Sequence, residues 1–109
     1  MAAAAPAPET PVFALLVQVG RAAGDGLPKG ATGAGLLCYA AGATEAEAVR
    51  ETVALLRAAE MAPLEVEGLG TAAEREAAGE EIDDDQRALM ARAAAENAVV
   101  VALVEPFFD

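Results

Sequence analysis

The 109-residue sequence contains no histidine and a single cysteine, Cys38. Without histidine the chain has no Ser–His or Cys–His pair for nucleophilic catalysis, and no imidazole that binds a metal ion. One cysteine excludes an intramolecular disulfide. Because Cys38 lies in the apolar stretch GLLCYA, with no cation near it in the sequence, we expect a buried structural residue and not a reactive thiol.

Basic residues are scarce, with seven Lys and Arg against eighteen Asp and Glu, and the net charge is −11. A surface of this charge repels phosphate backbones and anionic lipids, so we expect neither nucleic-acid binding nor membrane binding. No apolar run approaches the length of a membrane span, and the first residues lack the basic region of a secretory signal. We therefore expect a cytoplasmic protein, and the alanine-rich, lysine-poor composition is typical of GC-rich bacterial genomes.

Large apolar residues are few, because tryptophan is absent and alanine supplies much of the 55% apolar content. Residues 1–10 are rich in Ala and Pro without apolar periodicity, which predicts a disordered N-terminal tail. Residues 11–109 suit one domain with a modest core and closely approaching elements.

The apolar pattern predicts four strands and two main helices. The runs VFALLVQV (12–19) and LLCYAA (36–41) flank the Gly-rich segment 20–35, which predicts a hairpin with a long, mobile loop. PLEVEGLG (63–70) alternates like a half-exposed strand, and AVVVALV (98–104) is a continuous apolar strand.

Capping patterns mark the start of both helices. Thr44 and Glu47 match a capping box before an amphipathic run that ends ahead of Pro63. Asp83 and Gln86 resemble a second capping arrangement, before a run that Asn97 closes. Between the two helices, residues 71–82 are polar and predict one short helix or an irregular crossing.

The resulting ββαβαβ order predicts an α+β fold, with a four-stranded mixed or antiparallel sheet and two helices packed on one face. This architecture resembles ferredoxin-like two-layer sandwiches. The leading hairpin departs from the usual element order of that family.

The most acidic stretch is GEEIDDDQ (79–86), and its carboxylates are candidate ligands for Mg²⁺ or Ca²⁺: Glu80, Glu81, Asp83, Asp84 and Asp85. The stretch lacks the alternating ligands, central glycine and closing glutamate of an EF-hand loop. Adjacent aspartates at a helix start also point in different directions. We therefore predict helix capping and solvation here, and no catalytic residue, metal or cofactor.

The leading functional hypothesis is a small acidic, non-catalytic domain that binds a protein, most simply its own copy as a homodimer. The first strand, residues 12–19, is apolar on both faces, and Phe107 and Phe108 form an aromatic pair near the C-terminus. Because aromatic side chains commonly anchor interfaces, these two residues are the interface candidates.

Two alternatives remain open. The acidity suits an antitoxin or immunity-type protein that neutralises a basic partner, and AAGATEAEAVRETVALL is similar to the strand-to-helix junction of HicB-type antitoxins. Alternatively, Glu65 and Glu67 share a strand face and, with the acidic stretch, suit a carboxylate-based enzyme or a metal-dependent small-molecule binder.

Replacing Thr44 with alanine removes the predicted N-cap of the first helix. We expect the free energy of unfolding to fall by about 0.5–2 kcal/mol, because one backbone N–H of the first turn loses its acceptor. Denaturant melts measure this loss, and an unchanged midpoint would show that the helix begins elsewhere.

Overall fold

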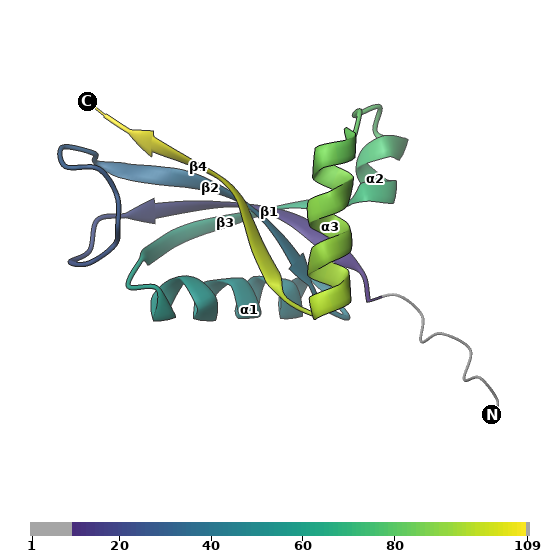
Figure 1. Ribbon diagram of the computed structural model, residues 1–109, viewed down its shortest axis with the longest axis horizontal. Coiled ribbons are helices and arrows are strands. Elements are labelled where there is room, and N and C mark those ends of the chain that lie inside the picture. The colour runs from purple at the N-terminus through teal and green to yellow at the C-terminus, as the bar shows by residue number, and fades with distance from the viewer. Residues whose placement is uncertain (1–9, 109) are drawn as a thin grey trace.

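A computed structural model describes residues 10–108, so the tail predicted over residues 1–10 lies outside the described residues except for Thr10. The elements follow one another as β1 Val12–Gly20, β2 Gly33–Ala41, α1 Glu45–Ala58, β3 Ala62–Thr71, α2 Ala72–Ala77, α3 Asp84–Glu96 and β4 Val99–Phe107 (Figure 1). The four strands form one antiparallel sheet in the order β3-β1-β2-β4. The predicted α+β class and its four-stranded sheet are confirmed.

The β1 strand is central and sets the register of its two neighbours. Val17 lies opposite Leu36 of β2 on one side and opposite Val66 of β3 on the other. These three side chains therefore form a row across one face of the sheet. The pairing of β1 with β3 shifts register twice, and the extra residues, Leu64 and Leu69, both belong to β3.

Two hydrophobic clusters lie on opposite faces of the sheet. On one face, Leu15 and Cys38 pack with Ala48 and Leu56 of α1. On the other face, Tyr39 of β2 packs with residues of α3. The buried members of that cluster are Ala14, Tyr39, Ile82, Met90 and Ala93. The helices thus cover both faces, which corrects the expectation that they share one face of a two-layer, ferredoxin-like sandwich.

The physical reason for the two covered faces is visible in β1 and β2. Adjacent residues of a strand point to opposite faces, yet both Ala14 and Leu15 are buried, as are Cys38 and Tyr39. A sheet that is apolar on both faces needs a covering element on each. The helix α1 supplies one cover, and α2 and α3 supply the other at one end of the sheet only (Figure 1).

Local sequence signals explain where the helices begin and end. Thr44 caps α1 by accepting a hydrogen bond from the Glu47 N–H at 3.2 Å, as predicted. Asp83 caps α3 by accepting from the Gln86 N–H at 2.8 Å, a bond that lowers the pKa of the Asp83 carboxyl. Asn97 ends α3 in the left-handed conformation that closes helices, with φ 48°.

The complete capping box of this domain stands at α2, where the sequence predicted only a short helix or an irregular crossing. The Thr71 hydroxyl accepts from the Glu74 N–H, and the Glu74 carboxylate accepts from the Thr71 N–H at 3.0 Å. These bonds hold the pKa of Glu74 below its usual value. They also end β3 and start α2 without a connecting loop.

At the start of β2, Gly33 lies so close to β1 that a Cβ there would stand 2.5 Å from the Val19 carbonyl oxygen. Gly33→Ala should therefore push the two strands apart and lower the free energy of unfolding by about 1–3 kcal/mol. Gly35→Ala is the matched control, since the nearest atom to its Cβ is the movable ring end of Phe107, at 3.2 Å. Denaturant melts that give the two variants the same midpoint would contradict this explanation.

Candidate functional site

The C-terminal strand β4 forms one edge of the sheet and pairs with β2 alone among residues 10–108. An edge strand presents a row of unpaired backbone N–H and C=O groups, which is a template for a further strand. Segment Val99–Val104 carries no charged side chain. This edge therefore has hydrogen-bonding capacity and none of the charges that usually discourage strand addition.

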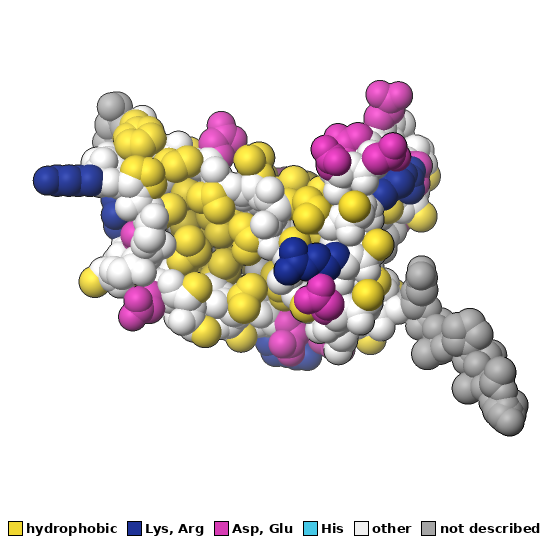
Figure 2. Space-filling view, viewed as in Figure 1, with side chains coloured by type: hydrophobic (Ala, Val, Ile, Leu, Met, Phe, Trp, Pro, Cys, Tyr) yellow, Lys and Arg dark blue, Asp and Glu magenta, His cyan; other side chains and the backbone are white. Residues whose placement is uncertain are grey.

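Apolar side chains of β4 are exposed on both faces of the sheet. Val101 and Val104 lie on the α1 face and are 39% and 42% exposed, while Leu103 lies on the opposite face and is 55% exposed. Figure 2 shows a continuous hydrophobic area over the strands, beside α3 and above α1. The helices therefore leave the β4 side of the sheet without a full apolar cover.

A register shift between Leu37 and Cys38 gives β4 one extra residue, Ala102. Val101 lies opposite Cys38 and Val104 opposite Leu36, two positions that share the α1 face. In a regular strand, residues three apart point to opposite faces. The bulge thus gathers Val101 and Val104 on one face of the edge strand.

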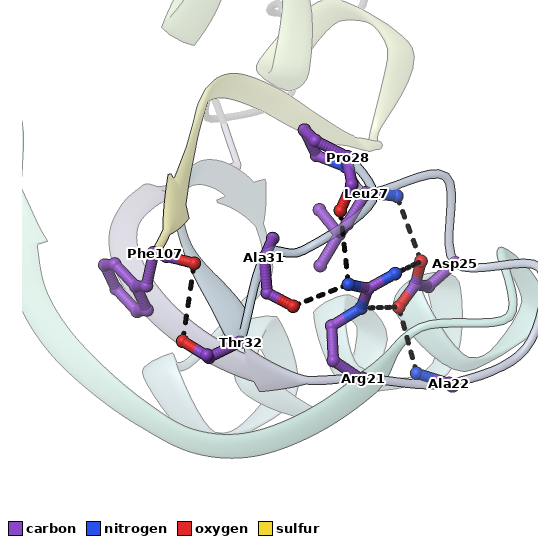
Figure 3. A network of polar contacts seen from close by, with 8 residues as sticks. All are labelled: Arg21, Ala22, Asp25, Leu27, Pro28, Ala31, Thr32 and Phe107. Atoms are coloured by element: carbon purple, nitrogen blue, oxygen red, sulfur yellow. Dashed lines mark hydrogen bonds and ion pairs between the residues drawn. The ribbon is translucent and has the colours of Figure 1, made fainter. Parts of the chain in front are cut away.

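The end of β4 is held by the loop between β1 and β2. The Thr32 N–H donates to the Phe107 carbonyl oxygen at 2.8 Å. Figure 3 shows that the Thr32 hydroxyl donates to the same oxygen, at 3.3 Å. The Phe107 ring lies against Gly35 of β2. Phe107 and Phe108, the predicted interface residues, are both exposed and stand at the end of this same edge.

An ion pair organises the same loop from within. The Arg21 guanidinium donates to the Asp25 carboxylate at 2.9 Å and to the Ala31 carbonyl oxygen at 2.6 Å (Figure 3). Asp25 is buried and also accepts from the N–H groups of Ala22 and Leu27. The Arg21 hydrogen bond, followed by these backbone bonds, holds the pKa of Asp25 well below its usual range.

The glycine content of this loop predicts mobility, and the structure shows which hydrogen bonds define the conformation of the loop. In the sequence, the ion pair of this loop lies in the stretch RAAGD, where Arg21 and Asp25 are four residues apart. The remaining cation of the loop, Lys29, is exposed near the tip. The loop thereby fixes both the β1–β2 hairpin and the end of β4.

The acidic residues considered from the sequence as metal ligands make separate contacts or are exposed. Glu80 contacts the buried Arg75 at 3.3 Å, Asp83 caps α3, and Asp84 and Asp85 are exposed in the first turn of that helix. Glu81 is also exposed. Over residues 10–108, no three Cys, Asp or Glu side chains come together in a way that would hold a metal ion.

The carboxylates weighed for catalysis lie on the opposite edge strand. Glu65 and Glu67 are exposed on β3, opposite Gln18 and Leu16 of β1. No described pocket has either glutamate in its lining. One hollow, about 640 Å³, lies between the start of β1 and helices α2 and α3, and five alanines contribute to its lining. Another, about 680 Å³, is lined by Glu76 and by the acidic stretch, including Glu80, Glu81 and Asp83.

The buried Arg75 was not identified from the sequence, because a single arginine in a polar segment is ordinarily solvated. Cys38 is buried as predicted, and burial raises the pKa of its thiol to about 11. A thiol with a raised pKa is a poor nucleophile at neutral pH. Cys38 is therefore a core residue.

Comparison with protein families gives a match over residues 12–108 to a family described as a domain of unknown function, DUF8846. The chain belongs to this family. The match runs from β1 through β4 and includes both Phe107 and Phe108. No curated protein and no solved structure matches the chain. Within residues 10–108 of this DUF8846 domain, no helix is long and apolar enough to cross a membrane.

Asp25→Asn should destabilise the DUF8846 domain in a manner that depends on pH. The folded-state pKa of Asp25 lies below its ordinary value of 3.8, so the charged carboxylate stabilises the fold above that value. This contribution is lost as pH falls through the folded-state pKa, because the unfolded chain binds the proton first. The stability difference between the original and the variant should shrink from about pH 5 to about pH 2.

Thermal melts of the two proteins across this pH range measure the difference. Because the other carboxylates titrate in both proteins, their effects cancel in the comparison. A difference that stays constant with pH would mean that Asp25 acts through loop shape alone.

Proposed function

We propose that this DUF8846 domain is a non-catalytic protein-binding module that receives a β-strand of its partner along β4. The observation that carries the proposal is the uncharged segment Val99–Val104 on an unpaired edge, with apolar side chains exposed on both faces. In strand addition, backbone hydrogen bonds supply affinity and alternate side chains supply specificity. The β4 edge offers both.

The contrast between the two edges of the sheet supports this choice. The β3 edge carries Glu65 and Glu67, begins near Pro63 and contains two register shifts. Charges, proline and bulges are the features by which proteins prevent pairing at sheet edges. The β4 edge has one bulge, and its Glu105 and Pro106 lie beyond the apolar segment.

Exposed carboxylates would suit a basic partner, yet several of them near α2 and α3 already have partners within the chain. Arg87 bonds to Glu76, and Arg75 bonds to Glu80. These contacts lower the local charge that a basic protein would meet. Segment Val99–Val104 of β4 carries no charged side chain and so forms no ion pair within the chain. We therefore place the binding function there.

Site-specific photo-crosslinking tests the proposal in the cells that produce the protein. A benzophenone amino acid at Leu103 should give a discrete adduct with a protein chain, because Leu103 stands on the proposed edge. Leu64 is the matched control, since it is an exposed leucine on the opposite edge strand, 68% exposed against 55% for Leu103.

The Leu103 adduct should disappear when Val101 and Val104 are both replaced by glutamate, since charges on an edge oppose pairing. Absence of an adduct at Leu103, or equal adducts at Leu103 and Leu64, would contradict strand addition at β4.

A further inference from the structure

We infer that the strand received by β4 is the β4 strand of a second copy, so that two four-stranded sheets join across a two-fold axis. The inference rests on the proposed function and names its partner. A two-fold axis perpendicular to the sheet places identical edge strands side by side and antiparallel. Each copy then presents the same residues to the other.

The β4 bulge makes this edge complementary to itself. With the axis between Ala102 and Leu103, Val101 of each copy lies opposite Val104 of the other. These pairs require both valines on the same face of the sheet, which is the arrangement that the extra residue Ala102 produces. Ala102 likewise meets Leu103 of the second copy on the α3 face, since Leu103 pairs with Leu37, which packs in the same cluster as Ala102.

Charge also favours a second copy at this position. Two chains of net charge −11 repel each other, so they approach best along a segment without charge. In this register Glu105 lies opposite Val100 of the other copy, and the two Glu105 positions are about 14 Å apart along the strands, because the bulge reduces the span to four residue spacings. That separation exceeds the screening length of about 8 Å at physiological ionic strength.

The opposite edge does not offer this arrangement. Pairing of β3 with its own copy would bring Glu65 and Glu67 of the two chains onto one shared strip. Like charges directly across a strand pair destabilise it. The β4 edge is therefore the one that two acidic copies share.

Light scattering over a dilution series tests the inference. The original protein should have twice the 10.9 kDa mass of one chain. Leu103→Glu and Leu103→Lys should each have the mass of one chain, because like charges then meet near the axis. An equimolar mixture of these two variants should return to twice that mass, because opposite charges meet at the same place.

Leu64→Glu is the matched control and should keep the doubled mass, because Leu64 lies on the β3 edge. If the Leu103 variants fail to fold, Leu103→Cys and Leu64→Cys with a short bis-maleimide replace them. A crosslinked dimer should then form through position 103 and not through position 64, and the original protein should show that the buried Cys38 does not react.

A single-chain mass for the original protein at every concentration would overturn the inference, as would a Leu103 mixture that stays monomeric or a Leu64→Glu variant that dissociates. The proposed function fails separately, through the absence of any Leu103 photo-adduct. A monomeric protein whose Leu103 adduct contains a different chain would overturn only the second copy as partner.

Added salt provides an independent measurement of the same dimer. Because screening weakens the repulsion between two acidic chains, the dissociation constant should decrease as ionic strength rises. A dissociation constant that increases with salt would indicate an interface held by opposite charges and would overturn the arrangement proposed here.

Discussion

The pairing of β1 with β2 is the constraint on which the rest of this domain depends. Both strands are apolar on both faces, so that neighbouring residues such as Leu15 and Ala14 are buried in different clusters. A hairpin of this kind needs a covering element on each face, although Leu16 of β1 stays exposed. Helix α1 covers one face, and α2 and α3 cover part of the other. The hairpin therefore determines on which side of the sheet each helix lies.

Covering two faces with few large residues has a consequence at the margin of the sheet. Helix α2 has only six residues, and the buried contacts of α3 come from residues as small as Ala93. Cover is therefore incomplete away from the helices, where Leu16 of β1 is exposed, and it is thin along β4, where Val101, Leu103 and Val104 are exposed. The apolar edge follows from the same two-sided burial that builds the core.

Sequence patterns predicted much of the fold because its signals are local. The strand runs, the caps at Thr44 and Asp83 and the closing residue Asn97 depend only on neighbours within a turn. The placement of α1 and α3 on opposite faces depends on crossings between distant elements, and the amphipathic patterns of the two helices do not specify it. The β4 bulge could not be predicted either, because AVVVALV is apolar on both sides and fixes no register. Phe107 and Phe108, the interface candidates from the sequence, lie at the end of this edge, but the sequence did not predict the exposed edge itself.

The two edges of the sheet decide what kind of assembly this domain can form. A strand edge that pairs head to tail with a different edge gives an open filament, whereas an edge that pairs with its own copy closes after one step. Glu65, Glu67 and the register shifts of β3 oppose addition at that edge, so only β4 remains. Pairing of β4 with β4 then buries the one unprotected edge in both copies and leaves the charged β3 edges outermost. The large negative charge also favours pairing at β4, because repulsion between two copies is weakest along the uncharged segment Val99–Val104. In the proposed dimer, an apolar edge that would otherwise promote aggregation would be limited to a closed, two-fold pair.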